Sequence, residues 1–144
     1  MISDTKLSHS IGVARECYRI AKEKYGYSEE IARAAWMTGY CHDVGYEFLK
    51  EGEPLDNHAK IGAELVWLAF RGESHAIKNH GTRSDEHSVL LDILNEADLM
   101  VDTKGNVVGI VKRLEDIKHR YGEASVEYKE ALDIAKSLKL VSAD

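Results

Sequence analysis

The sequence has few cysteines and almost no proline, and each scarcity excludes a class of structure. Its 144 residues include 2 cysteines, Cys17 and Cys41, which form no Cys-x-x-Cys pair. This excludes a disulfide framework and predicts a reduced, cytoplasmic protein. The 1 proline, Pro54, and the scarcity of alternating β-branched residues favour helices over strands.

Long apolar runs and basic clusters are missing as well. No apolar run approaches the roughly 18 residues of a membrane-spanning helix, and the first 10 residues lack the features of a signal peptide. The 19 basic residues stand against 25 acidic ones, a formal net charge of −6. We therefore expect neither a membrane nor a nucleic acid as partner. An anionic substrate would need local positive charge, which bound metal can supply.

The chain does contain apolar residues spaced three and four apart, the pattern of amphipathic helices. Its 144 residues, 44% hydrophobic and 31% charged, suit one globular domain spanning residues 1–144. We predict an all-α bundle of about seven helices. The predicted helices span residues 6–25, 29–42, 58–70, 73–80, 86–101, 107–121 and 125–140. Ser28 is the expected N-cap of the second helix, and Arg71-Gly72 the expected stop of the third.

A His-Asp doublet, His42-Asp43, ends the second predicted helix, with Gly45 two residues beyond it. An imidazole nitrogen and a carboxylate oxygen together suit a first-row transition metal. Taken alone, such a doublet is more often a core histidine that hydrogen-bonds to a neighbouring acid. The spacing of the other histidines therefore decides how the doublet is interpreted.

Further candidate ligands lie in an ordered series along the chain. His9 and His58 are near predicted helix starts, and His80 is at a helix end. Asp98 lies on a strongly apolar helix, where an acid is costly unless it is paired or bound to metal. Helix ends can converge on one pocket of a bundle, so the series predicts a shared site.

This ordered series resembles the HD-domain superfamily of metal-dependent phosphohydrolases. The resemblance covers residues 9–98, and the C-terminal helices, residues 105–140, lie beyond it. The matching segments are Leu7-Ser8-His9, Gly39-Tyr40-Cys41-His42-Asp43, His58-Ala59-Lys60-Ile61-Gly62-Ala63, Ala76-Ile77-Lys78-Asn79-His80 and Asn95-Glu96-Ala97-Asp98. It implies the all-helical HD fold and two divalent first-row metal ions, with iron as the first choice and manganese as the second.

The resemblance also implies a role for each residue of the series. His9, His42 and Asp98 would hold one ion, and His58 and His80 the other. Asp43 would bridge the two ions and act as the catalytic carboxylate.

The two additional histidines, His58 and His80, resemble a dinuclear subgroup of the superfamily. That subgroup includes bacterial hydrolases of symmetrical dinucleoside tetraphosphates. It implies hydrolysis of a phosphate ester or anhydride in a small nucleotide-type substrate, with a dinucleoside polyphosphate as the leading choice. The chain departs from the pattern at Tyr46, where many members carry lysine, and it is shorter than the typical tetraphosphate hydrolase. Cyclic-di-GMP phosphodiesterase activity is disfavoured because the second His-His-Glu and the Gly-Tyr-Pro elements are absent.

Two other functions stay open at this point. One is a non-catalytic HD module that binds metal or nucleotide, and the other is oxygen-dependent chemistry at a di-iron HD site. A homodimer is also left open.

Residues beside the series are candidates for secondary roles. Lys60, Thr82 and Arg83 are expected to bind substrate, Arg83 through its two-pronged guanidinium. Asp102 is expected to orient a metal-bound histidine. The remaining histidines are expected to be non-ligands: His75, His87 and His119.

Overall fold

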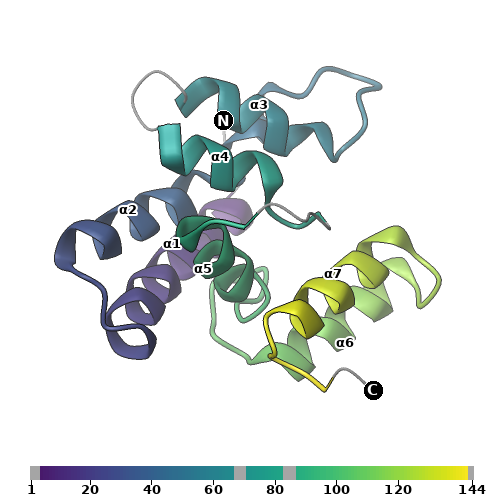
Figure 1. The fold of residues 1–144 in the computed structure, drawn as a ribbon. Coiled ribbons are helices and arrows are strands. Elements are labelled where there is room, and N and C mark those ends of the chain that lie inside the picture. The colour runs from purple at the N-terminus through teal and green to yellow at the C-terminus, as the bar shows by residue number, and fades with distance from the viewer. Residues whose placement is uncertain (1–3, 67–70, 83–86, 143–144) are drawn as a thin grey trace.

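The computed structural model describes residues 4–66, 71–82 and 87–142. Over these ranges the chain forms seven α-helices and no strand, which confirms the predicted all-α fold (Figure 1). The α-helices are α1 (Asp4–Arg19), α2 (Glu29–Cys41), α3 (Asn57–Val66), α4 (Arg71–Asn79), α5 (Val89–Asp98), α6 (Ile110–Tyr121) and α7 (Val126–Ser137). The π-helix η1 (Ile20–Lys24) continues α1, and the 3-10 helix η2 (Val44–Phe48) follows α2.

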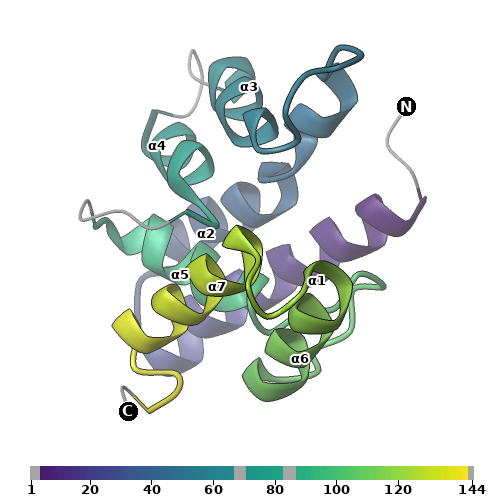
Figure 2. The same cartoon turned by 90° about the vertical axis from the view of Figure 1, so that its right-hand side faces the viewer.

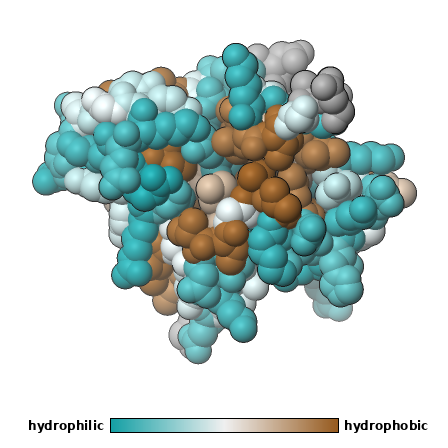
Figure 3. Space-filling view, turned by 90° about the horizontal axis from the view of Figure 1, so that it is seen from below, coloured by the Kyte–Doolittle hydropathy of each residue, from teal (hydrophilic) through white to brown (hydrophobic). Residues whose placement is uncertain are grey.

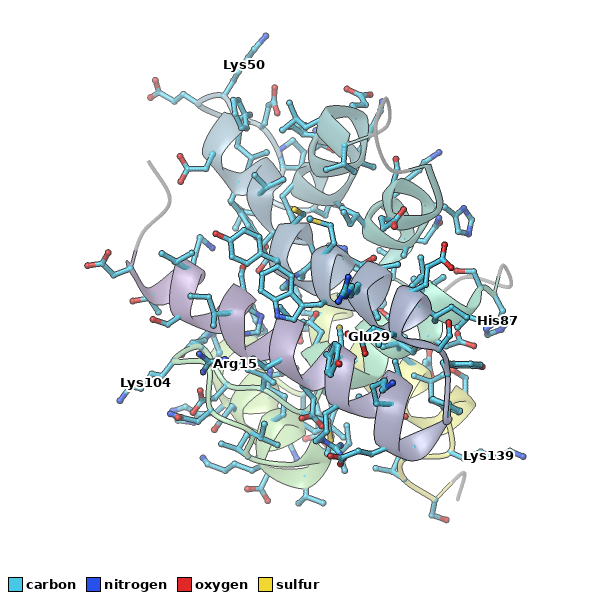
Figure 4. The ribbon with its side chains drawn as sticks, turned by 90° about the vertical axis from the view of Figure 1, so that its left-hand side faces the viewer. Arg15, Glu29, Lys50, His87, Lys104 and Lys139 are labelled. Carbon is cyan, nitrogen blue, oxygen red and sulfur yellow. The ribbon has the colours of Figure 1, made fainter. Side chains whose placement is uncertain are left out.

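Four of the first five helices, α1, α2, α4 and α5, share one apolar core, and α3 packs against α4. α1 and α2 lie side by side, α3 pairs with α4, and α5 contacts α1, α2 and α4 (Figures 1 and 4). The core is formed by buried apolar residues of α1, α2, α4 and α5, among them Val13, Cys17, Ala35, Ala76 and Leu94. Apolar burial of this kind is the main source of stability for such a bundle.

The last two helices form a hairpin with a smaller core of its own. Figure 2 shows α6 and α7 lying together in front of α1 and α5. Leu114 of α6 packs with Ala131, Ile134 and Ala135 of α7, and Leu99 joins them from the end of α5. Leu99 therefore links the hairpin to the rest of the bundle.

Several predicted helix ends are wrong, and each error has a local cause. Arg71-Gly72 does not stop a helix but lies in the first turn of α4. α5 begins at Val89 because the side chain of Ser88 caps it, accepting a hydrogen bond from the backbone N–H of Leu91. Glu86, the predicted start of α5, lies outside the described residues.

Two other boundaries concern the doublet and the C-terminal hairpin. η2 begins at Val44, directly after the doublet, so the chain remains helical for another turn beyond α2. α6 starts at Ile110 rather than Val107, because Val107 pairs with Val101 in an isolated antiparallel bridge. The cap predicted for α2 is confirmed: the hydroxyl of Ser28 accepts a hydrogen bond from the N–H of Ile31 at 3.3 Å.

The face of the molecule shown in Figure 3 is mostly hydrophilic. Seen from below, apolar residues gather near the centre of the face (Figure 3). Among the described helices none is long and apolar enough to cross a membrane.

Candidate metal centre

Five separate parts of the fold bring the six residues of the series together. α1 supplies one histidine near its start, the end of α2 supplies the doublet, and the first turn of α3 supplies the next histidine. The residue after α4 and the last residue of α5 complete the group. In chain order these residues are His9, His42, Asp43, His58, His80 and Asp98.

One side of the centre is formed by His9, His42 and Asp98. The Nε2 atom of His9 lies 3.0 Å from Oδ1 of Asp98, and Nε2 of His42 lies 3.5 Å from the same oxygen. One ligand atom from each of the three residues lies within 4.8 Å of the other two. His42 is fully buried. Three donors converging in this way fit one metal ion.

Asp43 faces both sides of the centre with different oxygens. Its Oδ2 lies 3.3 Å from Nε2 of His42 and 3.9 Å from Nε2 of His9. Its Oδ1 lies 3.4 Å from Nε2 of His58 and 3.6 Å from Nε2 of His80. Asp43 therefore lies between the two histidine pairs, with one carboxylate oxygen facing each pair.

All four histidines of the cluster are oriented by backbone carbonyls. A carbonyl oxygen can only accept, so each Nδ1 must carry the proton and each neutral ring presents its Nε2 lone pair to the centre. The acceptors are the carbonyl oxygens of Asp102 for His9 at 2.8 Å, Gly39 for His42 at 2.6 Å, Leu55 for His58 at 2.7 Å and Ile77 for His80 at 2.5 Å. Three of these carbonyls lie three residues before their histidine.

Two contacts test whether this arrangement suits a cation. Nε2 of His42 is buried and has no hydrogen-bond partner. Nε2 of His58 and Nε2 of His80 lie 3.3 Å apart. Two nitrogen lone pairs at that distance repel each other unless a positive charge, either a metal ion or a second ring proton, lies between them. The nitrogen and oxygen donors present are those that first-row metals accept, so the cluster fits a metal site.

In metal-free protein, the cluster is held together by attraction between protonated histidine and the two carboxylates. Burial alone would lower the pKa of His42, but the charges of Asp43 and Asp98 outweigh it and raise the pKa to about 9. Burial would raise the pKa of both carboxyls, yet His42 and the other imidazoles hold both well below their usual range. Metal ions at this centre would displace such protons.

The centre opens into a cavity of about 260 Å³. Tyr46 forms part of its wall and stacks on the ring of His58, with the ring centres 3.9 Å apart. Nζ of Lys6 lies 3.6 Å from the centre of the Tyr46 ring. The resemblance leads us to expect lysine at position 46. Tyr46 instead stacks on His58 of the cluster, and Lys6 of α1 lies over its ring.

Of the three residues predicted to bind substrate, one lines the cavity. Thr82 lines the cavity, and its hydroxyl donates a hydrogen bond to the carbonyl of Asn79 at 3.1 Å. Lys60 is exposed and is not among the residues that line the cavity. Arg83 lies outside the described residues.

Asp102 orients His9, but through its backbone. Its carbonyl oxygen accepts the His9 Nδ1 proton, whereas its carboxylate accepts backbone hydrogen bonds from Lys104 and Asn106, each at 2.9 Å. The side chain therefore shapes the turn that presents the carbonyl.

The remaining histidines stay outside the cluster. His87 is exposed, hydrogen-bonds to Asp92 at 3.1 Å, and lies at the edge of the molecule in Figure 4. His119 is exposed on α6, and His75 is partly buried on α4.

Sequence reasoning missed the far wall of the cavity, which α6 and α7 supply. Arg113, Ile117, Arg120 and Tyr121 of α6 line it. Their spacing marks one face of a helix, but nothing in the sequence says that this face meets the doublet. Also missed was Asn95, whose side-chain oxygen accepts a hydrogen bond from the N–H of Gly81 at 2.9 Å and fixes the turn after His80.

Comparisons with known proteins bear on this site. The family model described as HD domain matches residues 7–139. The comparison with curated proteins and the comparison with solved structures each returned no match.

Proposed function

Because the chain belongs to the HD-domain family, we propose that it is a metal-dependent phosphohydrolase that cleaves a phosphate ester or anhydride of a small nucleotide-type substrate. The observation that carries the proposal is the position of Asp43. Its two carboxylate oxygens face two histidine pairs, and it lines a cavity that a substrate can enter. A dinucleoside polyphosphate is the leading candidate substrate.

The proposed cofactor is a pair of divalent first-row ions, with iron as the first choice and manganese as the second. His9, His42 and Asp98 would hold one ion, His58 and His80 the other, and Asp43 both. Bound there, the ions would supply an activated water and positive charge for the phosphoryl oxygens.

The protein's own groups would fix the geometry of the reaction. The Nδ1 bonds to backbone carbonyls hold four imidazoles in one tautomer and one orientation. Burial of His9, His42 and His80 limits the access of bulk water to the centre. Hydrolysis adds the oxygen of one water to phosphorus and breaks one P–O bond. The leaving oxygen keeps the bonding electron pair, and the two protons of water end on the two products or in solvent.

The shape of the site bears on the non-catalytic alternative. A structural metal site is closed by protein ligands, whereas a catalytic one keeps an open side. The cavity reaches His9, Asp43, His58, His80 and Asp98, so five of the six candidate ligands border a space that a substrate can enter. This favours a hydrolase over a purely structural metal site, and oxygen-dependent chemistry is left to the test below.

The test is a substrate panel with protein reconstituted with iron or manganese. The panel contains AMP, ADP, ATP, diadenosine tetraphosphate and p-nitrophenyl phosphate, each assayed in air and under anaerobic conditions. We expect metal-dependent release of phosphorylated product at the same rate in both atmospheres, and its loss in the Asp43→Asn variant. Turnover only in air would support the oxygenase alternative, and fully metal-loaded protein that hydrolyses none of the panel would support the binding module.

A further inference from the structure

α6 crosses the open side of the centre from one histidine group to the other. Near its start, Nε of Arg113 donates a hydrogen bond to the backbone carbonyl of Asp98 at 3.3 Å. At its end, Tyr121 lines the same cavity as Tyr46, which stacks on His58. The helix therefore spans both halves of the centre.

Two arginines of α6 face the cavity. Arg113 and Arg120 both line it and are seven residues apart, which is two helical turns or roughly 10 Å. Neither forms an ion pair with any carboxylate of the described residues, although Arg19 and Arg33 each reach a glutamate. A guanidinium that borders a cavity without a carboxylate partner is free to bind an anionic ligand.

The acids of the same wall limit where an anion can lie. Asp116 lies on α6 between the two arginines, and Nζ of Lys112 neutralises it at 2.7 Å. Glu127 and Glu130 line the cavity from α7. Repulsion from the carboxylate of Glu127 would keep phosphates away from the start of α7 and along the arginine face of α6.

We propose that Arg113 and Arg120 bind the phosphoryl groups that flank the one at the metal centre, so that the substrate is a chain of linked phosphates cleaved internally. This inference rests on the proposed function. It selects phosphoanhydrides with phosphate on both sides of the broken bond, as in a dinucleoside polyphosphate, over terminal phosphate monoesters. The cavity of about 260 Å³ suits this, because a phosphate chain can thread it while nucleoside ends extend beyond it.

The test compares two ligands by equilibrium titration calorimetry on manganese-loaded protein. One is diadenosine tetraphosphate whose central bridging oxygen is replaced by methylene, which cannot be hydrolysed there. The other is AMP, with a single phosphate. Arg120→Gln should weaken binding of the tetraphosphate analogue about ten-fold, the value of one charge-assisted hydrogen bond, and leave AMP within about two-fold.

Two further variants sharpen the comparison. Lys118→Gln removes the same charge from an exposed residue of α6 that does not line the cavity, and should leave both ligands within about two-fold. Arg113→Gln should behave like Arg120→Gln. Because Arg113 also holds the Asp98 carbonyl, circular dichroism checks its fold, and Arg120→Gln carries the test on its own.

The inference is overturned if Arg120→Gln leaves the analogue unaffected, or weakens AMP and the analogue equally. It is also overturned if wild-type protein binds the analogue no more tightly than AMP while it hydrolyses monoesters, and in that case the proposed function survives. The opposite pattern, selective loss of the analogue in a protein that hydrolyses nothing in the panel, supports the arginine subsite and removes the proposed function.

Discussion

Among the glycines compared in the described part of the chain, Gly45, two residues after the doublet, has the least room for an added Cβ atom. A Cβ atom there would overlap the carbonyl oxygen of His58 and lie 2.6 Å from its carbonyl carbon and 2.8 Å from the backbone nitrogen of Gly62. All three are backbone atoms, which cannot rotate away. Gly45→Ala must therefore push η2 and α3 apart and move His58 relative to Asp43.

The expected cost follows from this geometry. Gly45 has no positive φ, so backbone strain does not contribute and the effect is steric. Overpacking costs about 1–3 kcal/mol, and a clash with backbone alone belongs at the upper end, so we expect the free energy of unfolding to fall by about 3 kcal/mol. Urea denaturation of metal-free protein measures this without a contribution from metal binding.

Gly62 supplies a matched control across the same contact. A Cβ there would lie 3.3 Å from the Gly45 nitrogen and 3.4 Å from side-chain methyl carbons of Ile77 and Val44, which can shift. Alanine also gains up to about 1 kcal/mol of helix propensity inside α3. We expect Gly62→Ala to change stability by less than about 1 kcal/mol. Equal effects of the two substitutions, or a loss below about 0.5 kcal/mol for Gly45→Ala, would refute this packing argument.

Three further predictions concern the centre and its support. Asp43→Asn should abolish binding of both ions and lower turnover by roughly a thousand-fold while circular dichroism stays helical, whereas His75→Ala, outside the cluster, should stay within about three-fold. The pKa of His42 is raised from 6.5 to about 9 by carboxylate charges that outweigh burial, so its contribution to the stability of metal-free protein is full below pH 6.5 and lost as the pH rises through 9. Urea titrations across that range should show stability falling, and a rise would contradict the assignment of charges. Asn95→Ala should cost about 0.5–1.5 kcal/mol in the same assay, because it removes the side-chain oxygen that accepts a hydrogen bond from the exposed N–H of Gly81.

The sequence allowed the helices to be predicted well where apolar spacing was regular and poorly at their ends. α1, α2 and α7 follow such spacing over several turns, and Ser28 marks a helix start through its own side chain. The start of α6 depended instead on the pairing of Val101 with Val107, a contact between segments that local pattern does not reveal. Gly72 was misassigned because glycine is more common after a helix than in its first turn.

The candidate ligands could be named from sequence because most stand near a predicted helix end and each lies in a segment that resembles the HD superfamily. Their orientation could not, because it depends on carbonyl groups of the backbone, such as that of Asp102 reaching His9 from across the fold. The arginine face of α6 was equally out of reach. Arg113 and Arg120 line the cavity only because the hairpin packs over the centre. The spacing of residues along the chain does not predict that packing.

The most direct measurement of the central claim is metal content. We propose two ions per chain, both held by Asp43 and each held by its own histidines. Elemental analysis of protein purified without chelator, then reconstituted with iron or manganese, should approach two ions per chain, and His58→Ala should lower it toward one. A value that stays near one in the wild type after reconstitution, or near zero, would contradict the dinuclear centre.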